Sequence, residues 1–385
     1  MFRGYAKIIA KYESMNWGEM PITYKIPALP PEKAKIESVE IYKALVRAHR
    51  ALAELKGHAR AIPNQGILID TLSLQEAKAS SEIENIVTTQ DQIFQIGTTA
   101  KAFENANQKE VARYRDALRT GLEGIGRQQG VLSNNTIIAM FQVLKSTTGE
   151  FRKTPGTELR NERTGETVYV PPQSHPEILR HMAALEQFVN GEDGADIDPL
   201  IRMAIIHHQF ESIHPFPDGN GRIGRIINVL FLVQQKLLDT PVLYLSRYIT
   251  QNKDQYYGLL QSTRDSGEWE PWLLYIINAV EQISKETIAM ISGIREIMAD
   301  YKSRIRRDHK FYSQDLLNNL FRHPYTRIEY VMSELQVSRP TASRYLEELR
   351  AGGFLERIES GRDVYFVNSP LVALFLKGFA NEALT

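Results

Sequence analysis

The chain has 385 residues, enough for two or three domains, and its 46 lysines and arginines balance its 46 aspartates and glutamates. This neutrality disfavours a general nucleic-acid coat or a polybasic membrane binder, because both need a large excess of positive charge. The absence of cysteine excludes disulfides, thiol catalysis and thiolate metal sites. The sequence has no run of 18 apolar residues and no apolar export segment near its start, so we expect a soluble, cytoplasmic protein without a membrane partner.

Helices dominate the predicted secondary structure. Residues 1–37 carry several prolines and predict an extended arm. Apolar residues then recur every three or four positions, which predicts helices over about 39–55, 72–86, 109–122, 134–144, 178–189, 201–213, 223–238 and from 272 to a basic run at 303–310. The stretch 157–171 instead has β-forming residues around a Thr164-Gly165 turn. It predicts a short hairpin whose exposed edge could accept another strand.

The last 75 residues predict a small domain of their own. Two short helices over 328–353 are followed by a hairpin with Ser360-Gly361 at its tip, which is the winged-helix pattern. Residues 311–385 contain eight Lys and Arg against nine Asp and Glu. Phosphate contacts carry most of the affinity for DNA, so this balance weakens a DNA-binding interpretation. Protein docking and dimerisation stay open as alternatives.

One segment, 214–225, combines three glycines with several charged side chains. Gly219, Gly221 and Gly224 match the spacing of a dinucleotide-binding loop, but that interpretation needs a preceding strand and alternating strands and helices. Here a helix precedes the glycines, and the sequence shows no such alternation. The P-loop motif is also absent. What remains is a glycine-rich loop that opens a helix.

Such a loop suits phosphate chemistry. Glycines let the backbone approach phosphates, and the N–H groups at a helix start bind anions. Arg222 and Arg225 lie on the first turn and can bind phosphate oxygens. Asp218 would repel phosphates unless it holds Mg²⁺, and His214 could accept a proton from a hydroxyl nucleophile. The pattern therefore indicates nucleotide phosphoryl-group chemistry. The neighbouring pair His207 and His208 is better explained as structural than as a metal site.

These residues resemble the Fic family of protein adenylyltransferases, whose signature is H-x-F-x-[DE]-G-N-G-R-x-x-R. Every fixed position is matched, from His214 and Phe216 to Arg225. The resemblance covers about residues 38–290, including a flap-like hairpin at 157–171, and an appended winged helix is common in such proteins. It implies a mainly α fold, with a Fic-type helical core, a short β-hairpin flap and a small C-terminal winged helix. The expected domains are an arm (1–37), an N-terminal helical region (38–125), a catalytic core (126–290), a linker helix (291–310) and the winged helix (311–385).

By this resemblance, the reaction transfers AMP from ATP to a Ser, Thr or Tyr hydroxyl of a protein and releases pyrophosphate. His214 is then the general base and Asp218 the ligand of Mg²⁺, the one cofactor expected. The flap residues Thr167 and Val168 clamp the target by strand addition, and Tyr256 or Tyr257 contacts adenine. The implied nucleotide-binding residues are Gly219, Asn220, Gly221, Arg222, Ile223, Gly224, Arg225, Thr167, Val168, Tyr256 and Tyr257.

A second motif, [ST]-x-x-x-E-[GN], marks the inhibitory helix of one Fic subclass, and Ser80, Glu84 and Asn85 match it. On a helix, Ser80 and Glu84 lie one turn apart on one face. The resemblance implies that Glu84 pairs with Arg225 and keeps this arginine from the γ-phosphate of ATP. The chain is thus expected to be a self-inhibited adenylyltransferase.

Two alternatives stay open. One is removal of AMP from a modified protein at the same site, with Glu84 positioning a water molecule. The other is a winged-helix transcription regulator that only senses ATP. Expected partners are ATP and a protein target, with the chain itself as one candidate target, and the resemblance admits a homodimer.

Overall fold

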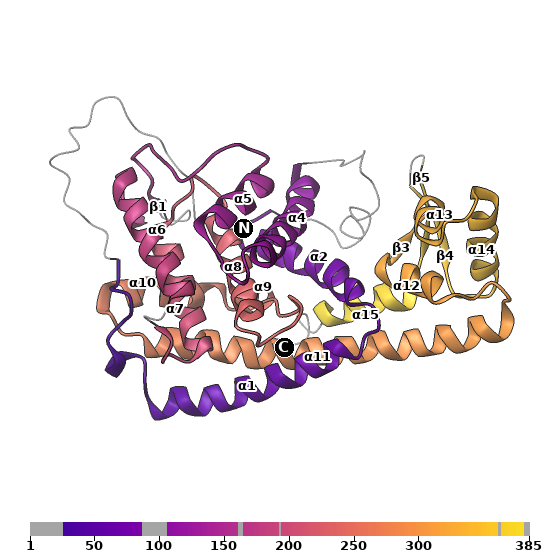
Figure 1. Cartoon of the computed structure of the whole chain (residues 1–385), viewed down its shortest axis with the longest axis horizontal. Coiled ribbons are helices and arrows are strands. Elements are labelled where there is room, and N and C mark those ends of the chain that lie inside the picture. The colour runs from indigo at the N-terminus through magenta and orange to yellow at the C-terminus, as the bar shows by residue number, and fades with distance from the viewer. Residues whose placement is uncertain (1–25, 87–105, 161–164, 192–193, 361–362, 381–385) are drawn as a thin grey trace.

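The computed structural model describes residues 26–86, 106–160, 165–191, 194–360 and 363–380. Its backbone is mainly helical, as predicted. The longest helix, α11 (Glu270–Asp308), runs along one side of the molecule, and α1 (Val39–Arg60) lies beside it (Figure 1). Helix α1 begins where the side chain of Ser38 accepts a hydrogen bond from the N–H of Ile41 at 3.1 Å. Its apolar face, including Leu45 and Leu52, is buried.

The centre of the core consists of α7 (Pro199–Ile213) and α8 (Asn220–Gln234), whose residues are buried on nearly all sides. Apolar residues lie on most sides of both helices, and a helix of this kind packs in the interior of a protein. The other helices around them are α2 (Gln65–Ile83), α4 (Ala106–Arg127), α5 (Asn134–Lys145), α6 (His175–Asn190), α9 (Ser246–Gln251) and α10 (Lys253–Ser266), with a short 3₁₀ turn η1 (Lys33–Lys35) before α1. Helices α9 and α10 have no counterpart among the predicted elements.

The predicted hairpin is present as β1 (Leu159–Arg160) and β2 (Thr167–Tyr169), which pair antiparallel with Leu159 opposite Tyr169. Residues 161–164 of its tip, including Thr164, lie outside the described residues. The hydroxyl of Tyr169 donates to the carbonyl of Ser212 on α7 at 2.8 Å. The hairpin is therefore anchored to the helix that precedes the glycine-rich loop.

The C-terminal region contains α12 (Gln314–Arg322), β3 (Tyr325–Thr326), α13 (Ile328–Leu335), α14 (Arg339–Ala351), β4 (Glu356–Ser360), β5 (Asp363–Val367) and α15 (Ser369–Ala380). The two predicted helices and the hairpin are α13, α14 and β4–β5. Strand β5 lies between β4 and β3. The sequence pattern missed β3, which is two residues long, as well as α12 and α15.

Helix α11 is continuous across the predicted boundary at residue 290, so the proposed linker 291–310 is the second half of a helix that begins in the core. A further connection comes from Asp70 on α2, which accepts hydrogen bonds from Arg119 on α4 and, at 2.5 Å, from Arg322 on α12. The C-terminal region thus contacts α2 directly. In the part of the chain that the structure describes, no helix is long and apolar enough to cross a membrane.

Candidate active site

A pocket of about 250 Å³ opens where the glycine-rich loop meets α2, α4, α5 and α10. Its lining brings together most of the residues that the sequence singles out. These are Glu84, His214, Asp218, Gly219, Asn220, Gly221, Arg222, Arg225, Tyr256 and Tyr257. The remaining wall comes from Ile86, Glu110, Lys145, Leu159 and Glu211.

The loop is held in shape by its own side chains. The Asn220 amide donates to the carbonyl of Phe216 and accepts from the N–H of Phe216, each at 2.8 Å. Phe216 is buried and stacks on Phe141 with ring centroids 4.0 Å apart. Gly219 has a φ of 78°, a conformation that favours glycine, and α8 begins immediately after it. The first N–H groups of α8 therefore face the pocket, where they can bind an anion.

Glu84 ends α2 and contacts both arginines of the loop. Its Oε1 accepts a hydrogen bond from Nη2 of Arg225 at 3.1 Å, and its Oε2 lies 2.6 Å from Nε of Arg222. Both guanidinium groups are almost fully buried. A Cβ added to Gly221 would lie 2.8 Å from Glu84 Oε1, so glycine at this position leaves space for the carboxylate. The single carboxylate of Glu84 thus pairs with both guanidinium groups of the pocket.

Ser80 adds two hydrogen bonds to the same arrangement. Arg225 donates from Nε to the Ser80 hydroxyl at 2.7 Å and from Nη2 to the Ser80 carbonyl at 2.9 Å. One turn earlier, buried Glu76 accepts hydrogen bonds from Tyr114 at 3.0 Å and from the hydroxyl of Ser246. Burial raises the pKa of Glu76 to about 7. Helix α2 is therefore fixed to the core by several buried polar contacts.

Asp218 is engaged by cations as well. Lys145 Nζ lies 2.6 Å from its Oδ2, and Arg222 Nη2 lies 3.6 Å from its Oδ1. Burial acts to raise the pKa of Asp218, but Arg222 and Lys145 outweigh it and hold the pKa below its usual value. Lys145 also pairs with Glu110 at 3.0 Å, and Glu110 accepts a hydrogen bond from Arg222. Lys145 and Glu110 thus connect α5 and α4 to the loop.

The side chain of Asp218 is 56% exposed and stands at the pocket. A single carboxylate of this kind suits Mg²⁺, which is often bound through one or two carboxylates together with substrate phosphates and water. Among the described residues, no group of three or more His, Cys, Asp or Glu could form a protein-only metal site. The donors present therefore fit a metal that arrives with a nucleotide, and Lys145 would compete with it for Asp218.

His214 ends α7 with φ 49° and ψ 58°, a left-handed conformation that is uncommon for residues other than glycine. It is 5% exposed. Burial, followed by the nearby cations Arg152 and Arg264, lowers its pKa to about 3. The imidazole is consequently neutral near pH 7, the form that can accept a proton.

Not every predicted site residue lies at the pocket. Ile223 is fully buried in the core, and Gly224 packs against Glu211 and His207. Thr167 and Val168 lie on β2, outside the lining, with Val168 41% exposed. Asn85 follows α2 with a φ of 59°, and its side-chain nitrogen is buried without a hydrogen-bond partner in the described part of the chain.

Three charged residues of the pocket were missed by the sequence interpretation, namely Glu110, Lys145 and Glu211. Glu110 and Lys145 lie far from the loop in the chain, so no local pattern indicates them. Glu211 stands three residues before His214 on the buried helix α7, and burial raises its pKa to about 7. The available signal for Glu211 was a carboxylate in a largely apolar helix, three residues before His214.

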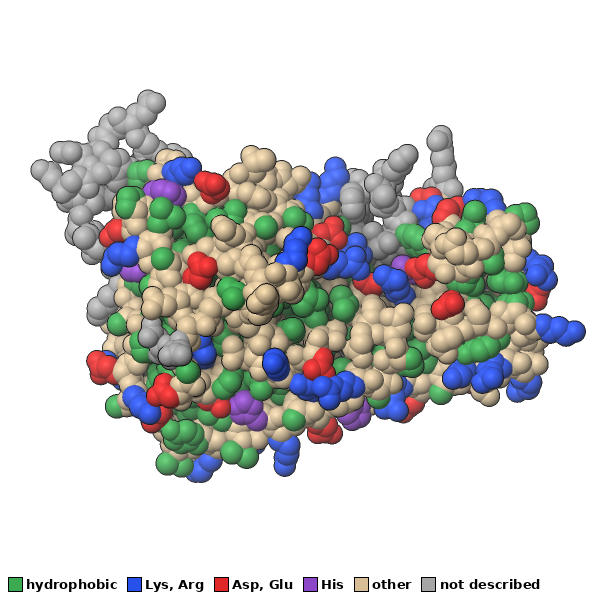
Figure 2. All heavy atoms as spheres, in the orientation of Figure 1, with side chains coloured by type: hydrophobic (Ala, Val, Ile, Leu, Met, Phe, Trp, Pro, Cys, Tyr) green, Lys and Arg blue, Asp and Glu red, His purple; other side chains and the backbone are tan. Residues whose placement is uncertain are grey.

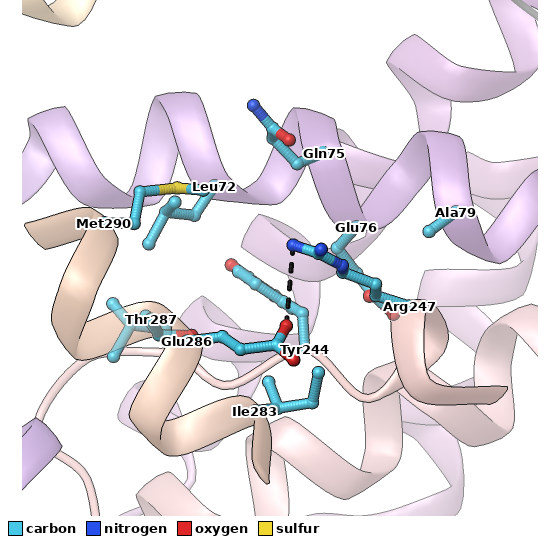
Figure 3. A pocket seen from close by; sticks show the side chains of 11 residues that line it. Leu72, Gln75, Glu76, Ala79, Tyr244, Arg247, Ile283, Glu286, Thr287 and Met290 are labelled. Atoms are coloured by element: carbon cyan, nitrogen blue, oxygen red, sulfur yellow. Dashed lines mark ion pairs between the residues drawn. The ribbon is translucent and has the colours of Figure 1, made fainter. Parts of the chain in front are cut away.

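A second cavity of about 60 Å³ lies on another side of α2, between that helix, α9 and α11 (Figure 3). Most of its lining is apolar, with Leu72, Ile283 and Met290 among the contributors. Arg247 and Glu286 form an ion pair across it at 3.5 Å. The polar end of Glu76 also borders this cavity, so α2 separates two hollow regions of the protein.

Three family models match the chain. "Fic/DOC family N-terminal" matches residues 42–123, "Fic/DOC family" matches residues 131–232, and "Protein adenylyltransferase SoFic-like, C-terminal domain" matches residues 297–371. The second of these contains the whole glycine-rich loop. The first contains the Ser80–Glu84 motif.

Curated relatives match over shorter stretches. The chain is 34% identical over 90 residues to "Probable protein adenylyltransferase" of Aquifex aeolicus, covering 23% of the chain and 27% of the relative. It is 29% identical over 99 residues to protein adenylyltransferase fic-1 of Caenorhabditis briggsae, covering 26% and 18%. It is 24% identical over 147 residues to protein adenylyltransferase Fic of Drosophila yakuba, covering 38% and 28%. The matched parts span less than a third of each of these relatives.

Solved structures share the fold. A Fic family protein from Desulfovibrio desulfuricans superposes with a TM-score of 0.56 at 20% identity, covering 88% of this chain and 98% of that one. Fic-1 from C. elegans gives a TM-score of 0.51 at 20% identity, covering 64% and 71%. At this identity the similarity concerns the fold alone.

Proposed function

Because the chain belongs to the Fic/DOC family, we propose that it is a self-inhibited protein adenylyltransferase, which transfers AMP from ATP to a protein hydroxyl and releases pyrophosphate. One observation carries the proposal: Glu84 neutralises Arg222 and Arg225 in a pocket that also contains His214 and Asp218. These side chains supply an anion site, a base and a metal ligand. Their geometry suits a nucleotide triphosphate once Glu84 is displaced.

Each side chain has a defined task in this reaction. Neutral His214 takes the proton of the attacking hydroxyl, and the N–H groups at the start of α8 bind the phosphates. Arg222 and Arg225 bind the β- and γ-phosphates bidentately. Asp218 holds Mg²⁺, which supplies charge neutralisation of the phosphates when bound. Tyr256 and Tyr257 line the pocket from α10, where a base could stack.

The hairpin provides a docking place for the target. Strand β2 carries the exposed Thr167 and Val168, and its other end is fixed to α7 through Tyr169. A target segment added along this strand would present its hydroxyl towards His214 in a fixed register. The substrate is therefore an extended segment of a protein rather than a free small molecule.

Inhibition follows from charge competition. A γ-phosphate and the Glu84 carboxylate are both anionic, and both require Arg225. While Glu84 keeps its two arginines, ATP lacks the contacts that orient its α-phosphate for attack. The contacts of Glu84 with Arg222 and Arg225 support this proposed inhibition.

The test compares the wild type, Glu84→Gly and His214→Ala with Mg²⁺ and ATP labelled at either the α- or the γ-phosphate. We expect α-label to become attached to protein, at least about tenfold more with Glu84→Gly, and neither with His214→Ala nor with γ-label. Glu82→Gly is the matched control, because Glu82 lies on the last turn of α2 and pairs with Lys78 at 2.5 Å instead of with the loop. If no variant transfers α-label although all bind ATP, the proposed function is wrong.

Removal of AMP at the same site is a second candidate. It is favoured by Glu84 itself, which lines the pocket together with His214 and could position a water molecule. Incubation of a labelled, adenylylated target distinguishes the two activities. Release of labelled AMP by the wild type and loss of this release in Glu84→Ala would assign removal as the dominant activity.

A role limited to DNA-binding regulation receives less support. Helix α14 of the C-terminal domain pairs its arginines with glutamates, including Arg350 with Glu347 at 2.6 Å and Arg339 with Glu329 at 2.9 Å. On the face drawn in Figure 2, acidic and basic side chains are intermixed over this domain. Arginines already paired in this way gain less from phosphates. Docking of a protein is the function that we propose for this domain.

A further inference from the structure

Arg152 is a buried arginine next to the pocket that the proposed chemistry does not use. It lies between α5 and β1, its residue is 5% exposed, and it is absent from the pocket lining. Its guanidinium donates from Nε to the carbonyl of His214 at 2.9 Å and from Nη2 to the carbonyls of Ile213 and Pro172. Its backbone N–H donates to the carbonyl of Pro215 at 2.8 Å.

These bonds act on the strained end of α7. His214 holds a left-handed conformation, which is strained for a residue with a Cβ and persists only where neighbouring groups enforce it. The last carbonyls of a helix have no partner inside the helix, and a cation near them also interacts favourably with the helix dipole. Arg152 supplies both the hydrogen bonds and the charge at this position. Arg152 therefore holds the backbone of His214, from which the ring projects.

The same guanidinium reaches the segment that follows the flap. Pro172 comes three residues after the end of β2, and the ring nitrogen Nδ1 of His175 lies 3.0 Å from the backbone oxygen of Arg152. The guanidinium of Arg152 thus binds both the backbone of the base and the segment that follows the strand proposed to hold the target. Such a common anchor would keep a docked hydroxyl within reach of the imidazole.

Charge adds a second effect. The groups that act on His214 are Arg152 and Arg264, which lower its pKa, and Asp218 together with a hydrogen bond to the backbone of Glu211, which raise it. Burial remains the largest cause. Because Arg152 bears a positive charge beside the imidazole, its removal should raise the pKa of His214.

We propose that Arg152 is the positioning residue for the base of the reaction: it fixes His214 in its left-handed conformation and couples it to the flap. The inference rests on the proposed adenylyltransferase function. It adds a residue that stands outside both sequence motifs and that touches neither nucleotide nor metal in the proposed arrangement.

The test uses Arg152→Lys and Arg152→Gln in the Glu84→Gly protein. Lysine keeps the charge but cannot bind several carbonyls in a planar fork, whereas glutamine loses the charge as well. We expect both to bind ATP as the parent does, and to lower kcat for α-label transfer about tenfold or more. KM for the protein target should rise, since the flap keeps its Tyr169 contact but loses the one made by Arg152. Only Arg152→Gln should shift the acid limb of the pH profile of kcat/KM to higher pH.

Arg202 offers a matched control. It is 6% exposed, stands on α7, and binds carbonyls at the end of α6, including that of Phe188 at 2.6 Å. Arg202→Lys and Arg202→Gln should lose stability in a comparable way without changing kcat per folded molecule or the acid limb. If the Arg152 variants behave like the Arg202 variants after correction for folded fraction, the proposal is overturned.

A measurement without catalysis separates this proposal from the proposed function. NMR titration of ring-labelled histidines, with His214 assigned through its loss in His214→Ala, reports the imidazole pKa directly. We expect that pKa to be higher in Arg152→Gln than in Arg152→Lys. An unchanged value in Arg152→Gln contradicts the positioning role even if the parent proves inactive. Absence of α-label transfer by the Glu84→Gly parent would instead contradict the adenylyltransferase assignment.

Discussion

Glu84 Oε2 lies 2.6 Å from Nε of Arg222, so the residue that ends α2 pairs with the first arginine of the loop as well as with the second. The sequence resemblance implies only the pair with Arg225. In the proposed function both arginines bind phosphates, so one carboxylate would then block two phosphate positions. Inhibition of this kind should depend on charge more than on the volume of the side chain.

Glu84→Gln tests this dependence, because the amide keeps the size of the side chain and removes its charge. We expect ATP to bind about tenfold more tightly than to the wild type, since the arginines no longer hold a competing anion. AMP lacks the β- and γ-phosphates, so its affinity should change little. Calorimetric titration with a non-hydrolysable ATP analogue and with AMP gives both values. An equal gain for AMP would contradict the assignment of Arg222 and Arg225 to the outer phosphates.

The Ser80 hydroxyl should help to retain Arg225 in the inhibited state. Ser80→Ala removes the 2.7 Å hydrogen bond to a charged donor, and such bonds contribute about 1.5–3 kcal/mol. We expect basal α-label transfer to rise severalfold, although less than with Glu84→Gly. Ser81→Ala is the matched control, because Ser81 is equally buried and its hydroxyl has no hydrogen-bond partner among the described residues. A rise of similar size in Ser81→Ala would point to loosening of α2 instead.

Lys145 should weaken metal binding at Asp218, because its ammonium group lies 2.6 Å from that carboxylate. In Lys145→Ala, the Mg²⁺ concentration that gives half-maximal transfer should fall severalfold, because a competing cation is removed. The measurement is a Mg²⁺ titration of α-label transfer in the Glu84→Gly protein. Lys153→Ala, which removes an exposed lysine paired with Glu150 at 3.2 Å, should leave the titration unchanged. An unchanged midpoint in Lys145→Ala would mean that Asp218 does not hold the metal.

Glu76 should make the stability of the protein depend on pH. Its pKa is about 7 in the folded state against an ordinary value of 4.5, so between these values the folded protein binds more protons than the unfolded chain. The stabilisation is therefore complete below pH 4.5 and is lost as the pH rises towards 7. Glutamine cannot titrate. The free energy of unfolding of Glu76→Gln should thus increase relative to the wild type by up to about 3 kcal/mol over this range.

Urea unfolding of both proteins at several pH values between 5 and 8 measures this difference. Comparison with the wild type is needed because buried His207 and His214, whose pKa values are lowered to about 3, act in the opposite direction. Glu123→Gln changes an exposed carboxylate and should show no such trend. A pH-independent difference between Glu76→Gln and the wild type would contradict the raised pKa.

Much of the fold could be predicted because it follows from local patterns. The apolar periods predicted α1, α7 and α8 as helices, and burial on nearly all sides then placed α7 and α8 at the centre. The hairpin 157–171 and the pair α13–α14 were also predicted. Helix boundaries were predicted less well. The helix predicted from residue 72 begins at Gln65 as α2, because the Asn64 side chain caps it by accepting a hydrogen bond from the N–H of Gly66. Helix α10 was missed although its buried positions follow a helical period, because two of them, Thr263 and Arg264, are polar.

The loop from His214 to Arg225 could be identified from the sequence, because its glycines and its charged side chains are contiguous in the chain and depend only on local backbone geometry. It also indicated that Glu84 belongs with this loop, through resemblance alone. Three contacts follow from the folded structure and from no sequence pattern. They join Glu84 to both arginines, Lys145 to Asp218, and Arg152 to the carbonyl of His214. These partners lie 62 to 141 positions apart in the chain. Their pairing depends on how the helices pack, and helix packing is set by the shape and burial of whole faces instead of by any short motif.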